Sequence, residues 1–356
     1  MNAKGKNSPE AGWKSFGQWI DNLFGDGLAE VFMRPYNFKV WAYSPDNMTA
    51  NWMGERVPTI NLDKILDNVL NKRDDVAWGP NAKFRYPNLG GTGSIWEAVA
   101  SWLPEKRLHF NKEVNGVDLG KKELSFKDGS KVKYDWLIST APLNHLLAMV
   151  KDVGSKFDNL RNEATTPWYS STHVIGLGFD GTMPEALNGK CWMYFPESNC
   201  PFYRATVFSH YSPNNVAKPY QQWSLMFEVS ESSQKPVSDD IVQATIDGAL
   251  ASKLITSAHL SHLATKFHIK MEQGYPTPFL ERDKWLGRIQ PVLEANNILS
   301  RGRFGGWRYE VGNQDHSLMQ GVEAVDHAIF GAEEQTYFYP DHVNSRKNTT
   351  RHWPEI

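Results

Sequence analysis

The chain has 356 residues, of which 40% are hydrophobic and 22% charged, with a formal net charge of −2. These values are typical of a globular protein with one large domain or two smaller ones. The missing basic excess argues against nucleic acid as a partner, and no stretch approaches the roughly 18 apolar residues of a membrane span. The opening MNAKGKNSPEAG has no apolar run and predicts no secretory signal.

Two cysteines, Cys191 and Cys200, lie nine positions apart. That spacing matches neither a zinc site nor a redox CxxC pair, and we expect no metal. Free thiols favour a reducing compartment, so a cytoplasmic location is expected.

Helical periodicity dominates the first part of the chain. Apolar residues recur at helical spacing over 13–24, Gly25 and Gly27 interrupt the pattern, and a second short helix is predicted over 28–32. Residues 62–71 predict another helix. Ser94 and Glu97 have the spacing of a capping box. We expect the helix that they open to bury Ile95, Val99 and Trp102.

Strand patterns take over after residue 107. Apolar and polar residues alternate over 107–140, Asp128–Gly129 forms a tight turn, and the run DWLIST is a short strand that ends before Pro142. Further strands are expected at 171–179, 191–195, 203–211, 221–230 and 263–271, and helices at 239–253 and 279–295. The last strong element is a helix in which Leu318, Val322, Val325 and Ile329 share one face. The fold class is therefore α/β mixed (α+β), with a helical module and a multi-stranded, largely antiparallel sheet.

A dinucleotide fingerprint is missing from these 356 residues. No G-x-G-x-x-G follows a predicted strand, and the cluster GGTGSIW at 90–96 lacks the third glycine.

Several segments are too distinctive for generic core: FMRPYNFKVWA, WMGERVP, WGPNAKFRYPNLGGTGSIW, STHVIG, CWMYFPESNCPFYRATVFSHYSP, GYPTP and SRGRFGGWRYEVGNQDHS. Together they resemble the eukaryotic-type UDP-galactopyranose mutases over about residues 13–350. The run KDGSKVKYDWLIST is similar more widely to the amine-oxidase-like FAD proteins.

The resemblance implies an isomerase that interconverts UDP-galactopyranose and UDP-galactofuranose, which serves galactofuranose biosynthesis for cell walls. Its cofactor would be FAD in the reduced form, with NADPH as the reductant. Flavin N5 would attack the anomeric carbon of the sugar, and a flavin–sugar adduct would carry the ring opening. UDP-galactose and UDP-galactofuranose are the implied partners.

The resemblance also assigns the diphosphate contacts. Arg56 and Arg204 match the family's two diphosphate-binding arginines and are the expected catalytic residues. Fixed, forked cations suit a leaving group that gathers negative charge. Tyrosines that would donate hydroxyls to the same phosphates are Tyr211, Tyr275 and Tyr309.

Other positions match the nucleoside and sugar contacts. Asn37, Trp41 and Tyr194 match residues around the uridine, and Asn81 and Trp192 match residues around the galactose. The loops that carry Arg56 and Asn81 would be mobile flaps. Each position also has a plainer interpretation: core packing for a tryptophan, a turn or cap for an asparagine, a solvated charge for an arginine.

The implied flavin contacts lie in two places. Val114 matches the residue near the adenine, and Arg303 matches an arginine beside the isoalloxazine. A helix N-terminus carries partial positive charge and can stabilise an anionic flavin. The residues that open the last helix are Asn313, which also falls in the substrate set, Gln314 and Ser317.

Family members begin with a strand–turn–helix that carries the FAD fingerprint, which is missing here. We therefore expect an N-terminally truncated, incomplete fragment, whether from a truncated gene model or partial clone, as a shortened non-catalytic paralogue, or with a partner chain supplying the rest. The first Rossmann βαβ unit would be missing from a partial FAD-binding fold. The expected division is a helical substrate and flap module (1–75), a partial FAD-binding domain (76–150), an antiparallel-sheet substrate domain (151–295), and a return to the FAD-binding domain (296–356).

Two other functions stay open. One is a flavin-dependent oxidoreductase of the amine-oxidase or protoporphyrinogen-oxidase type, which would share KDGSKVKYDWLIST but gives no reason for the diphosphate set. The other is a nucleotide-sugar-binding remnant without catalysis.

Overall fold

The computed structural model describes residues 12–53, 62–73, 84–151 and 167–345. The chain divides into two compact units, each built from separate stretches of sequence. Unit 1 comprises Met1–Met48, Ile60–His109 and Tyr169–Tyr275, and unit 2 comprises Thr49–Thr59, Phe110–Trp168 and Pro276–Ile356.

Unit 1 begins with a helical module. Helix α1 (Phe16–Leu28) leads through a π-helical turn (Ala29–Met33) into α2 (Arg34–Trp41). The break predicted at Gly25 is confirmed, because this residue has a φ of 71°, a value that glycine adopts without strain.

The sheet of unit 1 has five strands in the order β10-β6-β9-β8-β7. Its strands are β6 (Tyr169–Asp180), β7 (Trp192–Tyr194), β8 (Arg204–Val207), β9 (Gln222–Glu231) and β10 (Leu263–Pro276). The pairs β6–β9, β8–β9 and β7–β8 are antiparallel. All five strands were predicted, although β8 is shorter than expected because a 3₁₀ turn begins at Phe208.

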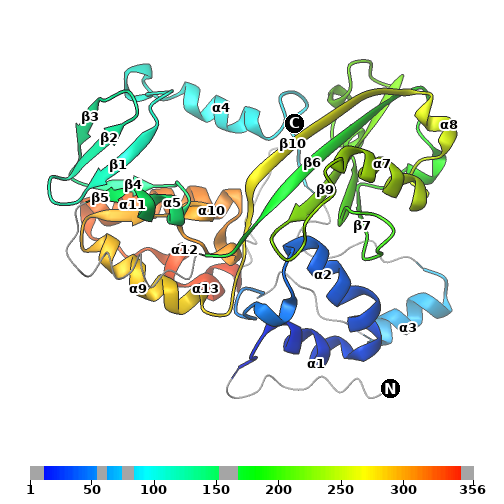
Figure 1. Ribbon diagram of the computed structural model, residues 1–356, viewed down its shortest axis with the longest axis horizontal. Helices are drawn as coiled ribbons and strands as arrows, with labels where there is room; N and C mark the ends of the chain where they lie inside the picture. The colour runs from blue at the N-terminus through cyan, green and yellow to red at the C-terminus, as the bar shows by residue number, and fades with distance from the viewer. Residues whose placement is uncertain (1–11, 54–61, 74–83, 152–166, 346–356) are drawn as a thin grey trace. The chain divides into compact units, whose positions relative to one another are not determined.

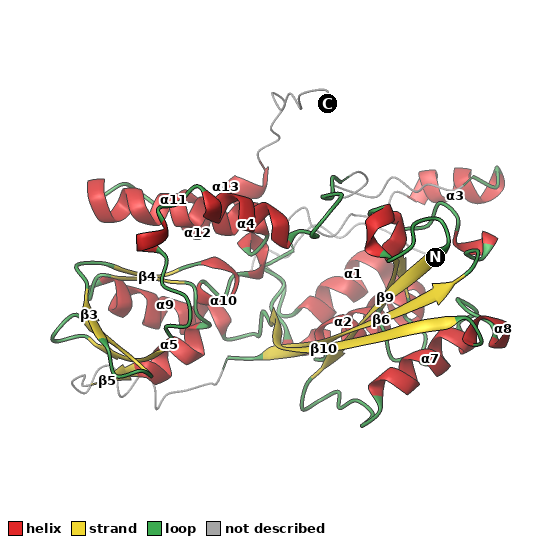
Figure 2. Cartoon of the chain, turned by 90° about the horizontal axis from the view of Figure 1, so that it is seen from above, coloured by secondary structure: helices red, strands yellow, loops and turns green. Residues whose placement is uncertain are grey.

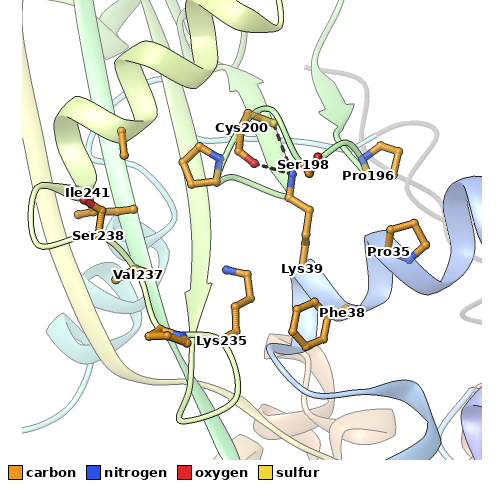
Figure 3. Close-up of a pocket in the computed structure, with 13 residues that line it drawn as sticks. Pro35, Phe38, Lys39, Pro196, Ser198, Cys200, Lys235, Val237, Ser238 and Ile241 are labelled. Carbon is orange, nitrogen blue, oxygen red and sulfur yellow. Dashed lines mark hydrogen bonds between the residues drawn. The ribbon is translucent and has the colours of Figure 1, made fainter.

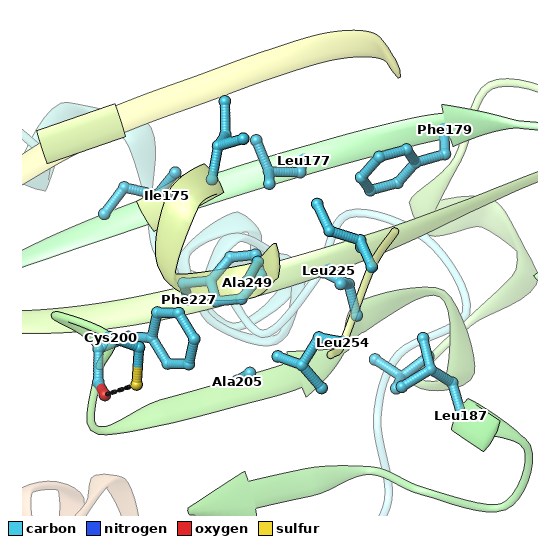
Figure 4. Packing of buried hydrophobic residues seen from close by; sticks show 14 of the residues in the cluster. Ile175, Leu177, Phe179, Leu187, Cys200, Ala205, Leu225, Phe227, Ala249 and Leu254 are labelled. Atoms are coloured by element: carbon cyan, nitrogen blue, oxygen red, sulfur yellow. Dashed lines mark hydrogen bonds between the residues drawn. The ribbon is translucent and has the colours of Figure 1, made fainter. Parts of the chain in front are cut away.

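One face of this sheet holds the core of unit 1. Side chains alternate between the faces of a strand, and Leu225, Phe227 and Val229 of β9 are buried on the same side as Ile175 and Leu177 of β6. Helix α7 (Ile241–Ala251) packs its Ile246 and Ala249 into this cluster (Figures 1 and 4).

The described residues of unit 1 also form the α-helices α3 (Leu62–Leu70), α4 (Gly93–Ser101) and α8 (Ser257–Leu260). The helices at 62–71 and after Ser94 are confirmed. The predicted capping box is wrong, because the N-cap of α4 is Thr92 and the Ser94 hydroxyl donates to the carbonyl of Gly91 at 2.7 Å.

The prediction that α4 buries Ile95, Val99 and Trp102 is wrong, because this apolar stripe is exposed. No residue of α4 is buried, and Trp102 is 82% exposed. A stripe of apolar residues predicts a helix that has a partner surface, and no described element covers this one.

Unit 2 contains two small sheets. The first has the order β3-β2-β1-β5, from β1 (Val114–Asp118), β2 (Glu123–Phe126), β3 (Lys131–Lys133) and β5 (Val150–Lys151). The predicted tight turn is confirmed, with Gly129 at a φ of 83°. The second sheet is the parallel pair of β4 (Leu137–Ser139) and β11 (Ile298–Ser300).

The helices of unit 2 are α5 (Leu143–Met149), α9 (Arg282–Glu294), α10 (Gly302–Gly305), α11 (Gln314–Phe330), α12 (Gln335–Phe338) and α13 (Pro340–Ser345), which can be followed in Figure 2. Two buried ion pairs connect them. Arg301 donates to both carboxylate oxygens of Glu334 at 2.6 Å, and Arg282 donates to both oxygens of Glu310 at 2.8 Å.

These elements confirm the mixed helix and sheet class with a multi-stranded antiparallel sheet. Among the described residues, no helix combines the length and apolarity that crossing a bilayer would require.

Candidate functional site

The face of the five-stranded sheet opposite the core carries a set of polar and aromatic side chains. Ala205 and Val207 of β8 point into the core, so the alternation directs Arg204 to the other side. Cross-strand register places Tyr194 and Glu228 directly beside Arg204. Trp192 shares the face with Tyr194, because the two are separated by one residue on β7.

Arg204 forms a closely bonded pair with Glu228. Its Nε and Nη2 atoms donate to Glu228 Oε1 at 2.8 and 2.6 Å, and Nη2 also donates to Oε2 at 2.7 Å. Tyr203 donates its hydroxyl to Oε2 at 2.6 Å. Burial lowers the pKa of Arg204, but the charge of Glu228, the hydrogen bond to it and the nearby tyrosines Tyr275 and Tyr203 together raise that pKa above its usual range.

Trp192 and Tyr211 meet beside this pair. The indole Nε1 of Trp192 donates to the Tyr211 hydroxyl oxygen, and the same hydroxyl also lies beside the side chains of Cys191 and Thr206. The Arg204 guanidinium lies 5.4 Å from the centre of the Trp192 ring. Burial raises the pKa of Tyr211, so the hydroxyl keeps its proton at neutral pH.

The segment that follows Asn81 in sequence closes around Tyr211. Phe84 stacks on Trp192 at 5.4 Å between ring centres and meets Tyr211 edge-on at 5.0 Å. The Ser212 hydroxyl donates to the carbonyl of Asn88 at 2.6 Å and holds the two segments together.

Helix α2 contributes the other side of this cluster. Asn37 and Trp41 are one helical turn apart and therefore share a face; both are buried. The Trp41 ring packs against Tyr275 at 5.6 Å, and Tyr36 packs against Tyr194 at 5.4 Å. Burial raises the pKa of Tyr36 well above its usual value, and the positive charge of Arg204 opposes that shift.

A second group of predicted residues lies in unit 2, around the start of α11. Arg303 sits 5.3 Å from the centre of the Tyr309 ring and donates from Nη1 to the carbonyl of Gly312 at 3.2 Å. Tyr309 also packs edge-on against Trp52 at 5.3 Å. Asn313 is the N-cap of α11, and its side chain makes no capping hydrogen bond.

The remaining predicted flavin contacts lie in the same unit. Gln314 is the first residue of α11, and the Ser317 amide donates to the Asn313 carbonyl at 2.8 Å. Val114 begins β1. Arg56 and Asn81 fall outside the described residues.

Seven of the predicted substrate residues thus come together in unit 1: Asn37, Trp41, Trp192, Tyr194, Arg204, Tyr211 and Tyr275. The meeting of Tyr309 with Arg204 stays a prediction. The sequence reasoning missed Glu228, Tyr36 and Phe84. Glu228 had a visible signal, because it is the one carboxylate inside the apolar run of its strand, LMFEVS.

No group of three or more His, Cys, Asp or Glu side chains in the described parts of the chain could hold a metal ion.

The sequence pattern of the flavin containing amine oxidoreductase family matches residues 12–324. A crystal structure of reduced UDP-galactopyranose mutase superposes with a TM-score of 0.90 at 48% sequence identity, covering 95% of this chain and 72% of that one. A candidate protoporphyrinogen oxidase from Exiguobacterium sp. 255-15 superposes at 0.57 with 15% identity, covering 84% of this chain and 64% of that one, which shows a shared fold. The chain therefore belongs to the flavin containing amine oxidoreductases and, among them, to the UDP-galactopyranose mutase family.

Proposed function

We propose that this chain recognises a UDP-sugar and serves the isomerisation of UDP-galactopyranose to UDP-galactofuranose. The observation that carries the proposal is the cluster of unit 1, in which residues from α2, β7, β8 and the end of β10 meet. Residues 37 and 275 are far apart in sequence, yet the packing of unit 1 gathers one guanidinium, three phenols, two indoles and one amide in a single cluster. Such a set suits a nucleotide diphosphate and an attached sugar.

In this proposal Arg204 binds the diphosphate. Separating UDP from the sugar concentrates negative charge on the phosphate oxygens, and a fixed guanidinium in a partly buried site stabilises that charge. Glu228 holds the planar fork in one orientation, so little conformational freedom is lost when the substrate binds. Tyr211 and Tyr275 donate hydroxyl protons to the same phosphates.

Asn37 and Trp41 bind the uridine together with Tyr194, and Trp192 contacts the galactose. In the same proposal Asn81 contacts the galactose and Arg56 provides the second diphosphate cation.

The start of α11 fits the anionic edge of a flavin. Arg303 supplies a permanent charge, and the first-turn amides of a 17-residue helix provide partial positive charge beside Asn313. We assign Arg303, Asn313, Gln314 and Ser317 to the flavin, Val114 to the adenine, and Tyr309 to the diphosphate of the substrate. Reduced FAD, kept reduced by NADPH, supplies the nucleophile for the anomeric carbon when it is bound.

Calorimetric titration of UDP into the 356-residue chain tests the recognition step. Because a hydrogen bond to a charged group contributes about 1.5–3 kcal/mol, Arg204→Ala should weaken UDP binding by about tenfold or more. Arg204→Lys should restore part of the loss, since the charge returns without the fork. The matched control is Arg288→Ala, an exposed arginine of unit 2. Unchanged UDP affinity in a folded Arg204→Ala protein would refute the assignment.

The reaction class needs a separate assay. In a form that holds FAD, dithionite should permit conversion of UDP-galactofuranose to UDP-galactopyranose, and Arg204→Ala should slow it by about two to three orders of magnitude. Amine oxidation by the same protein would favour the oxidoreductase alternative. UDP binding without conversion would favour a nucleotide-sugar-binding remnant.

A further inference from the structure

Unit 1 has a pocket of about 360 Å³, and no proposed substrate residue within the described part of the chain lines it. Its walls come from α2, the 196–201 loop and the segment that leads into α7 (Figure 3). Most lining residues are apolar, including four prolines and Phe38. The polar ones are two lysines, Lys39 and Lys235, with Ser198, Ser238 and Cys200. No carboxylate side chain of a described residue lines the pocket.

Lys39 is a fixed cation in this wall. Its Nζ donates to the carbonyls of Glu197 and Cys200 at 2.8 and 3.0 Å and lies 3.4 Å from Cys200 Sγ, which engages all three hydrogens. Burial lowers the pKa of Lys39, whereas Cys200 and Glu197 oppose this shift. Lys39 therefore supplies a steady positive field and has no hydrogen left for a ligand.

Lys235 is the cation that a ligand can reach. Among the described residues its Nζ makes one hydrogen bond, to the carbonyl of Ser230 at 2.5 Å, so two of its three hydrogens remain. Burial lowers the pKa of Lys235 to about 8, and the charge of Lys39 acts in the same direction. Glu231 acts against them, but that carboxylate is already bonded to Lys270 at 2.8 Å and to His173 at 3.0 Å.

We propose that this pocket binds a small organic carboxylate with a flat apolar body. The two remaining N–H groups of Lys235 match the two oxygens of a carboxylate. The prolines and Phe38 match an aromatic or short aliphatic body, because they offer apolar contact without polar groups that a ligand would have to satisfy. A phosphate dianion fits less well, because its oxygens surround the phosphorus and leave no apolar side to place against the prolines and Phe38.

Charge accounts for both the affinity and its pH dependence. A partly buried ammonium without a counterion is costly, and an anion beside Lys235 removes that cost. A carboxylate such as benzoate is ionised throughout neutral pH. Lys235 is charged below about pH 8, so affinity should be constant near pH 6.5 and should fall as the pH rises through 8.

The test is a titration of the 356-residue chain with sodium benzoate, in which binding is measured by ligand-observed NMR. We expect saturable binding in the millimolar range or tighter, and weakening by about tenfold or more in Lys235→Gln. Lys266→Gln, an exposed lysine on β10, is the matched control and should bind normally. Neutral benzamide and inorganic phosphate should each fail to displace benzoate.

A second variant keeps the test informative if Lys235→Gln does not fold. Val237→Trp fills the pocket and leaves both lysines in place, so it should abolish benzoate binding while UDP binding persists. The proposal is overturned if benzoate does not saturate, if benzamide binds equally well, or if binding survives Val237→Trp.

Discussion

Arg204 is paired before any substrate arrives. Glu228 accepts hydrogen bonds from its Nε and Nη2, and among the described residues Nη1 makes none. The pair carries no net charge. Glu228 therefore fixes the orientation of the Arg204 guanidinium, but its negative charge weakens the attraction of Arg204 for a phosphate. A buried carboxylate without this partner would destabilise the fold, and removing Arg204 alone leaves the charge of Glu228 buried and uncompensated.

Glu228→Gln separates these two effects. The amide preserves the size and an acceptor oxygen but removes the negative charge, so UDP should bind more tightly, by about 1 kcal/mol or roughly fivefold. The measurement is calorimetry with UDP at low and high salt, where the gain should shrink as salt screens it. Gln243→Glu adds a negative charge on the exposed side of α7. It is the control for a change in net charge away from the cluster and should leave UDP affinity nearly unchanged. Weaker UDP binding in a folded Glu228→Gln protein would show that orientation outweighs charge.

Part of this arrangement was predictable from the sequence. Arg204 and Tyr211 were identified through the segment PFYRATVFSHYSP, and the strand period directs Arg204 away from the core. The partner of Arg204 was not predictable, because the pairing with Glu228 depends on the register between β8 and β9, which strand periodicity leaves unspecified.

At the scale of elements, two helices display apolar stripes that no described element covers. The stripe of α11 was correctly placed on one face, and its members Leu318, Val322, Val325 and Ile329 are all exposed. Periodicity finds such a face because it depends only on local spacing. It cannot identify the covering surface, which is why the burial expected for α4 was wrong.

Because the apolar stripe of α11 is exposed, polar side chains should replace its residues with little loss of stability. Val322→Lys with Ile329→Lys should change the free energy of unfolding by no more than about 0.5 kcal/mol per site, and should reduce aggregation and binding of the dye anilinonaphthalene sulfonate. Light scattering and dye fluorescence measure both effects. Ala324→Lys, on the fully buried side of the same helix, should instead unfold the protein. A large loss of stability in the double variant would mean that the stripe is covered.

At the scale of the whole chain, the residues proposed for the flavin and those proposed for the nucleotide sugar form two separate sets. We propose Arg303, the start of α11 and Val114 as contacts for the two ends of FAD, but these 356 residues hold no G-x-G-x-x-G turn for its pyrophosphate. We therefore expect the purified 356-residue chain to be colourless after dialysis against FAD and to lack mutase activity. Retained UDP binding is the control for folding. A stoichiometric flavin peak in the absorbance spectrum would contradict this expectation.

The two units are interleaved along the chain. During synthesis, early segments therefore cannot complete their packing until later segments of the same unit have been translated. Unit 1 needs helices from the first 48 residues and strands that end at Tyr275. Lys39 and Ala42 of the early segment accept hydrogen bonds from Ser230 and Ser232, which are translated about 190 residues later. At roughly 5–20 residues per second, the N-terminal helices wait on the order of ten seconds or more before these partners emerge. During that interval Trp41 lacks its ring partner Tyr275 of β10, so we expect the early helices to expose apolar surface that a chaperone could bind.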